Sequence, residues 1–320
     1  MRDKTTIRKV PEGSLLHIYK ITVDGGVLFY RTIDHLVYYT IQSVMARRHN
    51  LSVLVSCHMF THTHDLCAPV DPAQIARYEQ DVNSVFAREY NRETGRKGQL
   101  FKKPFGSAAE RGDKDKRSAL VYILNNPVEK KLCRHSDENR WTFLAYYERE
   151  FPFSCKPVLK ECRWALRDAI RMVDQEYRAG RYLKYALLHK LFSGLNSAEK
   201  EILTDYILQR YFYFDKEACY SLFDSWEQMK DAADASKGKE FNVGEVFDLS
   251  SDIPYREMVS ITERYGLLSS GLPLLRMQEV RRDKVADYLR RHTQASDMQI
   301  AKFLHCQSMV NQSVVKVSGK

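Results

Sequence analysis

The segment LSVLVSCHMFTHTHDLCAP, residues 51 to 69, constrains the fold more than any other part of the chain. It is apolar and rich in β-branched residues, with a short break near its middle, which predicts two strands joined by a turn. We expect these two strands to pair in antiparallel fashion. Strand alternation sends residues i and i+2 to the same face, so His62 and His64 should point the same way.

Length and composition favour a globular protein that binds a polyanion. The chain has 320 residues, 44% of them hydrophobic, which favours two domains. Its formal net charge of +9 favours nucleic acid as the partner, because lysines and arginines that neutralise phosphates release counterions. The alternative is that this charge only keeps the protein soluble. The sequence contains no run of about 18 apolar residues and begins with polar residues, so we expect a cytoplasmic protein without membrane contact.

The spacing of apolar residues predicts alternating strands and helices in the first half of the chain. Strands or extended segments are expected at residues 14–23, in the two halves of 51–69 and at 98–105. Helices are expected at residues 31–49, 71–95 and 114–132. Asp71 and Gly95 suit the ends of the second helix, and Pro127 should end or kink the third. The order predicts an α+β fold, a ferredoxin-like antiparallel sheet with helices on one face.

The second half, residues 155–320, is expected to be all-helical, with a loop or linker at 231–245. Residues 281–317 have the pattern of a helix, a short helix capped by Ser296, a turn at His305-Cys306 and a final helix. This pattern is a candidate helix-turn-helix, although a plain helical bundle fits as well. Amides and hydroxyls near a DNA major groove would then come from Gln307, Ser308, Asn311 and Gln312. The predicted domains are residues 1–150 and 155–320.

A tyrosine and an asparagine add chemistry to the two histidines. Tyr122 and Asn126 are four residues apart, so they share a face of a helix. Nitrogen and oxygen ligands without thiolates suit Mg²⁺ or Mn²⁺ as well as zinc, and a metal on a phosphate oxygen polarises the phosphorus for attack. Tyrosine can be the attacker and form a covalent phosphotyrosine.

Each of these residues also has an ordinary explanation when taken alone. The histidines can be two polar residues on a strand, and Tyr122 can be a core aromatic. Asn126 precedes Pro127 and can simply end a helix. We interpret His58 as structural, because the break in the strand separates it from the pair.

A basic stretch with aromatic residues follows the second predicted helix. Its cations can clamp phosphates while its rings stack on unpaired bases, and the alternative is a solvated helix end with a basic loop. Its members are Arg88, Tyr90, Arg92, Arg96, Lys97, Phe101, Lys102 and Lys103. The same track would continue through Lys114, Lys116 and Arg117, although Asp113 and Asp115 oppose it.

Three motifs, taken in order, resemble a known family. They are HTH (62–64) after an apolar strand, EYNRETGRKGQLFKKPF (89–105), and YILNNPVEKKL (122–132) followed by RWTFLAYY (140–147). This order is similar to that of the single-tyrosine HUH transposases, particularly the REP-associated tyrosine transposases. The resemblance covers about residues 14–150 and implies the HUH nuclease fold.

The resemblance also implies a metal-dependent DNA endonuclease and strand transferase. His62 and His64 would hold Mg²⁺ or Mn²⁺, Asn126 would be a third ligand, and Tyr122 would be the nucleophile. The family cuts single-stranded DNA at or near a hairpin, leaves a 5′-phosphotyrosine and a free 3′-hydroxyl, and then rejoins strands. The implied partner is DNA, chiefly single-stranded or hairpin, bound by a monomer or a homodimer.

The sequence departs from the family pattern at three places. Thr63 stands where a bulky hydrophobic residue is usual, Phe60-Thr61 replaces a Pro-Asn pair, and Lys103-Pro104 replaces a Gly-Arg pair. These departures leave a second function open, a non-catalytic, domesticated DNA-binding protein derived from a transposase. A zinc-stabilised structural protein is disfavoured because the seven cysteines are scattered without a CxxC pair, and it predicts unfolding on chelation.

Overall fold

A four-stranded antiparallel sheet lies at the centre of the computed structural model, which describes residues 10–103, 105–235 and 251–306. The strand order is β2-β3-β1-β4. The strands are β1 (Leu15–Ile21), β2 (Ser52–His58), β3 (His62–Ala68) and β4 (Gly106–Glu110). The predicted α+β class is confirmed, and so is the antiparallel pairing of the two halves of 51–69.

The fourth strand begins later than the sequence predicts. Residues 98–103 form an extended arm instead, in which Leu100 accepts a backbone hydrogen bond from Val23 at 2.9 Å and Lys102 donates one to Ile21 at 2.9 Å. The strand itself, GSAAE, contains none of the β-branched or aromatic residues on which strand prediction depends. Of the two alternatives for residues 98–105, the extended arm is therefore right.

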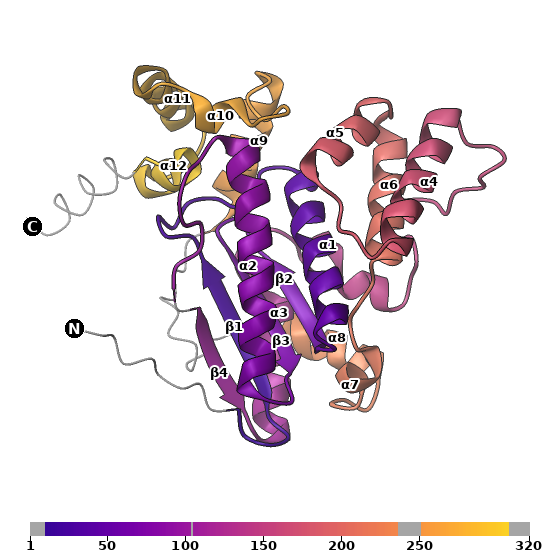
Figure 1. Cartoon of the computed structure of the whole chain (residues 1–320). Coiled ribbons are helices and arrows are strands. Elements are labelled where there is room, and N and C mark those ends of the chain that lie inside the picture. Colours follow the sequence, from indigo (N-terminus) through magenta and orange to yellow (C-terminus); the bar gives the residue numbers. More distant parts are fainter. Residues whose placement is uncertain (1–9, 104, 236–250, 307–320) are drawn as a thin grey trace, which may run out of the picture.

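Helices α1 (Thr32–Arg48) and α2 (Pro72–Thr94) pack together over one face of the sheet (Figure 1). The side chain of Asp71 accepts a hydrogen bond from the backbone N–H of Gln74 at 2.7 Å, which caps the start of α2. Gly95 follows the helix with φ of 74°, a left-handed conformation that glycine adopts at little cost. Both predicted ends of this helix are confirmed.

Helix α3 (Asp113–Glu129) covers the opposite face of the sheet (Figure 1). On β3, Asp65 accepts a hydrogen bond from a glutamine of α1 at 2.9 Å, whereas the ring of its neighbour His64 lies 5.6 Å from that of Tyr122 in α3. The prediction that the helices lie on one face is therefore wrong. The physical reason is that residues 119–127 of α3 are buried on every side, so the helix needs cover around its whole circumference.

In the described part of the chain after residue 130, every regular element is a helix and none is a strand. Three short 3₁₀ helices come first: η1 (Ser136–Glu138), η2 (Arg140–Thr142) and η3 (Leu144–Tyr147). Five α-helices follow: α4 (Trp164–Arg178), α5 (Tyr185–Ser193), α6 (Ser197–Arg210), α7 (Lys216–Tyr220) and α8 (Trp226–Ala235). Four more complete the described part: α9 (Ile253–Arg264), α10 (Pro273–Arg276), α11 (Glu279–His292) and α12 (Asp297–Leu304). The predicted helical character of this region is confirmed for the described residues.

The helices α4 to α8 share an apolar core with the sheet and its helices. The ring of Tyr39 in α1 lies 5.4 Å from that of Tyr213, and Ser43 donates a hydrogen bond to the carbonyl of Tyr211 at 2.6 Å. The domain boundary between residues 150 and 155 stays a prediction.

The last four helices form a second apolar cluster that packs on the segment before α1. Tyr30 donates a hydrogen bond from its hydroxyl to the carbonyl of Phe303 at 2.5 Å. The predicted N-cap at Ser296 is confirmed, because its hydroxyl accepts a hydrogen bond from the N–H of Gln299 at 3.2 Å. The final helix expected in the helix-turn-helix, with Gln307, Ser308, Asn311 and Gln312, lies outside the described residues, so that motif stays a prediction.

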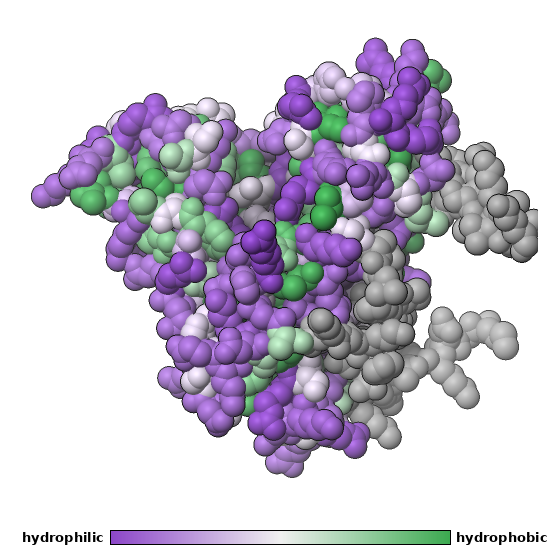
Figure 2. Space-filling model, turned by 180° about the vertical axis from the view of Figure 1, so that it is seen from behind, coloured by the Kyte–Doolittle hydropathy of each residue, from purple (hydrophilic) through white to green (hydrophobic). Residues whose placement is uncertain are grey.

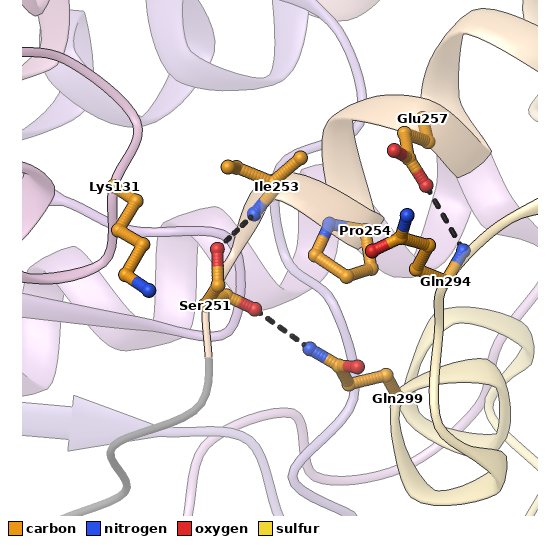
Figure 3. Close-up of a pocket in the computed structure, with 7 residues that line it drawn as sticks. All are labelled: Lys131, Ser251, Ile253, Pro254, Glu257, Gln294 and Gln299. Carbon is orange, nitrogen blue, oxygen red and sulfur yellow. Dashed lines mark hydrogen bonds between the residues drawn. The ribbon is translucent and has the colours of Figure 1, made fainter.

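A hollow of about 370 Å³ lies where α9 meets α12 and the turn before it (Figure 3). Gln299 donates a hydrogen bond to the carbonyl of Ser251 at 2.8 Å, and the N–H of Gln294 donates one to Glu257 at 3.1 Å. These two hydrogen bonds attach α12 and the turn before it to α9 and to the residues that precede α9.

The surface opposite to the view of Figure 1 is mostly hydrophilic where the structure describes it, with apolar side chains gathered in patches between polar ones (Figure 2). Within the described ranges, no helix combines the length and the apolar character that crossing a bilayer requires.

Glu93, at the end of α2, joins several parts of the molecule. Its Oε1 accepts hydrogen bonds from Arg31 at 3.0 Å, from His189 of α5 at 2.8 Å and from the N–H of Gly271 at 2.9 Å. Burial alone raises the pKa of Glu93, but the hydrogen bond from His189 and the charge of Arg31 outweigh it and lower the pKa to about 2. The ionised carboxylate therefore holds this junction together.

Acid should weaken the Glu93 junction. A carboxyl group with a lowered folded-state pKa stabilises the fold above its ordinary pKa of 4.5, and this contribution is lost as pH falls towards 2. We expect Glu93→Gln to be less stable than the wild-type chain at pH 7, with a difference in unfolding free energy that shrinks as the pH is lowered through this range. Denaturant unfolding at several pH values measures it, and a difference independent of pH would contradict the assignment.

Candidate active site

The predicted histidine pair and the predicted tyrosine meet between the sheet and α3. The rings of His62 and His64 lie 5.0 Å apart on the same face of β3. The ring of Tyr122 meets that of His64 edge-on, with 5.6 Å between centroids and an interplanar angle of 89°. Asn126 lies one turn further along α3, buried, and its Nδ2 donates a hydrogen bond to the carbonyl of Tyr122 at 2.9 Å.

Two residues of β1 belong to the same cluster and were missed by the sequence analysis. His17 Nε2 lies 3.0 Å from His64 Nδ1, within hydrogen-bonding distance. The ring of Tyr19 lies 5.5 Å from that of His62 and 5.1 Å from that of His64. Since Tyr19 pairs with His64 in antiparallel register, alternation places both β1 residues on the histidine face. The available signal was the placing of His17 and Tyr19 two residues apart in LLHIYKI, which puts both on one face of a strand. The sequence does not show that this strand pairs with β3, so it could not place them beside His62 and His64.

The imidazoles of His17 and His64 are neutral at physiological pH. Burial lowers the pKa of His64 to about 3. Burial, and then the nearby His64, lower the pKa of His17 well below its usual value. A neutral imidazole can bind a metal or accept a proton, whereas a protonated one can do neither.

The donor chemistry of His62 and His64 suits metal ligands. His17 contacts Nδ1 of His64, and the hydroxyl of Thr61 lies 3.0 Å from Nδ1 of His62, so a metal would bind at Nε2 of each ring. Neighbours that hold the second nitrogen in this way orient a ligating imidazole. In the part of the chain that the structure describes, no group of three or more histidine, cysteine, aspartate or glutamate side chains could hold a metal. An ion at this pair would therefore need further ligands, such as the Asn126 amide, water or an oxygen of a bound molecule.

The cluster is largely enclosed. The exposed fraction of Tyr122 is 8%, and His64 is fully buried. Tyr19 is more open, with intermediate burial. Tyr122 therefore offers little surface to a large substrate in this conformation.

The basic stretch is divided between the surface and the core. Five of its cations are exposed: Arg88, Arg92, Lys97, Lys102 and Lys103. Arg96 instead forms an ion pair with Asp24 at 3.3 Å. Tyr90 and Phe101 are buried in the core, where Tyr90 donates a hydrogen bond to the carbonyl of Val27. The expectation that these two rings stack on bases is not supported, because a buried ring offers no face to a base.

His58 was predicted not to share a face with His62 and His64, and the structure agrees. Its imidazole lies on the face of α1, where its Nε2 is 2.9 Å from Oε1 of Gln42. His58 therefore does not share the face of His62 and His64.

Comparison with known proteins adds one distant structural similarity. No protein-family profile matches the sequence, and no curated protein matches it. Among solved structures, the chain is similar to a REP-associated tyrosine transposase bound to a REP hairpin, with a TM-score of 0.34 and 15% sequence identity. The similarity covers 42% of this chain and 78% of the other. The function of this chain is therefore inferred from its own site.

Proposed function

We propose that this protein cuts and transfers single-stranded DNA through a covalent phosphotyrosine at Tyr122, with a divalent metal at His62 and His64. The observation that carries the proposal is the packing of a tyrosine ring against a buried, neutral His64, which itself contacts His62 and His17. A phenol nucleophile and metal-ligand chemistry thus lie within one cluster. Both serve phosphoryl transfer to a tyrosine, because the phenol oxygen can attack phosphorus and a bound metal can polarise a phosphate oxygen.

The residues of the cluster have distinct roles in this reaction. The Tyr122 oxygen attacks the phosphorus, so that the new P–O bond forms as the bond to the 3′ oxygen breaks. The phenol proton passes to water, because a metal at Nε2 and the contact of Nδ1 with His17 leave His64 no lone pair to take it, and the departing 3′ oxygen takes up a proton from water to become a hydroxyl. When bound by the histidines, Mg²⁺ or Mn²⁺ would supply positive charge that polarises a phosphate oxygen.

DNA is the expected partner because of the exposed charges. The cations at the end of α2 and along the arm, Arg88, Arg92, Lys97, Lys102 and Lys103, offer contacts to a phosphate backbone. Such contacts are independent of sequence, so the exposed stretch supports binding of a strand without indicating which sequence is bound.

The test of this function uses the full chain and single-stranded hairpins from the flanks of its own gene, labelled at either end. With Mn²⁺, we expect a protein–DNA adduct that survives denaturation and carries the 5′ end of the downstream fragment. Chelator should abolish it. If the hairpins bind but form no adduct with Mn²⁺ or Mg²⁺, catalysis is excluded for these substrates.

The second candidate is a non-catalytic DNA-binding protein. It is favoured by the low exposure of Tyr122 and by the lack of a three-residue metal cluster among the described residues. It predicts hairpin binding that does not change when Tyr122 is replaced or the metal is removed.

His17 should act as a positioning residue for His64. Replacing a residue that holds the second nitrogen of a metal-bound histidine typically lowers metal affinity about 10- to 100-fold. We therefore expect His17→Ala to raise the Mn²⁺ concentration needed for half-maximal adduct formation by about that factor, with DNA affinity unchanged. Titrating Mn²⁺ in the adduct assay measures it.

His17→Asn is the matched control and should recover part of the loss, because its amide oxygen can accept a hydrogen bond from Nδ1–H of a His64 whose Nε2 binds the metal. A loss of adduct that saturating Mn²⁺ does not restore would contradict the positioning role.

A further inference from the structure

A second pocket lies on the other face of the sheet from Tyr122. It has a volume of about 220 Å³ and opens beside the turn between β2 and β3. The wall residues that matter here are Phe29, His35, His58, Phe60, Trp141 and Arg256. Three parts of the chain contribute them: the sheet with α1, the 3₁₀ helix η2 and helix α9.

The pocket is lined by planar rings that lie nearly parallel. The centroids of Trp141 and His35 are 3.9 Å apart with an interplanar angle of 4°, and those of His35 and Phe29 are 4.3 Å apart with an angle of 14°. His58 continues the set, 5.2 Å from Phe29 at 12°. Phe29, His35 and His58 are buried and cover one another's faces, so the partly buried Trp141 is the ring of this stack that a flat, aromatic ligand can contact.

The hydrogen bonds around His58 determine what its ring offers to a ligand. The amide nitrogen of Gln42 donates to Asp65, so the amide oxygen faces His58 and accepts from its Nε2–H. Nδ1 of the neutral ring is then an acceptor, and it is buried without a hydrogen-bond partner among the described residues. Nδ1 of His35 is buried without such a partner too. Buried polar atoms of this kind favour a ligand that satisfies them.

Arg256 brings a positive charge to the same pocket. One of its nitrogens donates a hydrogen bond to the carbonyl of Leu132 at 2.6 Å, which fixes the guanidinium near the pocket. No ion pair involving Arg256 occurs in the described part of the chain. A guanidinium without a carboxylate partner favours an anionic group on the ligand, and phosphate suits it.

We propose that this pocket binds one nucleotide, with the N–H-bearing edge of its base at His58, a polar atom of the base at His35 and its phosphate at Arg256. The pocket lies at the turn between β2 and β3, and Phe60 in its wall comes two residues before His62 of the candidate active site on the other face. The proposal rests on the proposed DNA function for its ligand, but binding can be measured without cleavage.

Two measurements on the full chain, both with chelator present so that no cleavage occurs, test the pocket. The first follows tryptophan fluorescence while deoxynucleoside monophosphates are added, with deoxyribose 5-phosphate as the probe that lacks a base. We expect saturable quenching by the nucleotides and none by the sugar phosphate. The second measures the anisotropy of a labelled single-stranded oligonucleotide, which distinguishes a nucleotide within a strand from a free one.

The variants are Trp141→Leu and Arg256→Gln, and each has a matched control. Trp164→Leu changes a tryptophan that is 71% exposed, and Arg264→Gln removes an exposed arginine of the same helix, α9. We expect the pocket variants to weaken oligonucleotide binding roughly tenfold or more and the controls to leave it within about twofold. Arg256→Gln should also abolish the nucleotide-induced quenching.

The outcomes separate this proposal from the catalytic one. If Trp141→Leu fails to fold, the proposal can still be tested with the other two proteins. Nucleotides should quench the fluorescence of the wild-type chain, and this quenching should be lost in Arg256→Gln. Nucleotide-induced quenching that persists in Arg256→Gln, or equal quenching by deoxyribose 5-phosphate, would overturn the pocket. If the pocket variants lose binding but the wild-type chain forms no adduct, the pocket stands and the catalytic function falls. Saturation by free nucleotides with no effect of the variants on oligonucleotide binding would assign the pocket to a free nucleotide instead of a strand.

Discussion

Tyr122→Phe should reduce the covalent protein–DNA adduct about a thousandfold or more, because it removes only the oxygen that would bond to phosphorus. The ring remains, so its edge contact with His64 and its place in the core should persist. We therefore expect the fold to persist and the hairpin affinity to stay within about twofold of wild type. Denaturing gels with labelled hairpin DNA and Mn²⁺ measure the adduct.

Tyr19→Phe is the matched control, because Tyr19 lies beside both metal-ligand candidates and its hydroxyl is the alternative nucleophile. This variant should keep the adduct. An adduct retained in Tyr122→Phe and lost in Tyr19→Phe would move the nucleophile to β1, while leaving the proposed type of reaction intact.

Lys20→Met should lower the free energy of unfolding by about 3–5 kcal/mol. The Lys20 ammonium is buried between two carboxylates, 3.3 Å from Asp65 Oδ2 and 3.2 Å from Glu79 Oε1. Burial alone would lower the pKa of Lys20, but Glu79 and Asp65 raise it well above its usual value, so the residue is charged. Methionine has a similar length without charge, and it would leave two carboxyl groups facing each other without a cation.

Burial raises the pKa of Glu79. In Lys20→Met, we expect one carboxyl of the pair to take up a proton, so the loss of stability should be larger at pH 8 than at pH 5. Denaturant unfolding at the two pH values measures this. Adding Glu79→Leu to Lys20→Met removes one of the stranded carboxyl groups and should recover part of the loss. If Lys20→Met alone lowers the free energy of unfolding by less than about 1 kcal/mol, the ion pairs of Lys20 with Asp65 and Glu79 do not stabilise the fold as proposed.

The sequence predicts the local elements of this fold well because local chemistry determines them. The Asp71 cap and the Gly95 end of α2 follow from hydrogen bonding and backbone freedom at single residues. Local chemistry does not determine which face of the sheet α3 covers. That choice depends on which apolar surfaces remain to be buried in the folded protein. The weakly patterned strand β4 is fixed by pairing with β1 instead of by its own residues.

The candidate site shows the same division. Alternation along β3 and the four-residue spacing in α3 predict that His62 and His64 share a face and that Tyr122 and Asn126 share another. His17 and Tyr19 enter the site only through the register of β1 against β3, which no local pattern specifies. Burial of Tyr90 and Phe101 likewise results from tertiary packing. The basic stretch therefore presents cations at the surface but not these two rings.

The most direct test of the central claim is to locate the covalent bond. The adduct formed with Mn²⁺ and hairpin DNA would be digested with nuclease and trypsin, and the peptides analysed by mass spectrometry. Cleavage after Arg117 and Lys130 gives SALVYILNNPVEK, residues 118–130, in which Tyr122 is the one tyrosine. We expect a nucleotide attached through its 5′-phosphate to this peptide. A nucleotide on any other peptide, or no modified peptide although the hairpin is bound, would contradict the assignment of Tyr122 as the nucleophile.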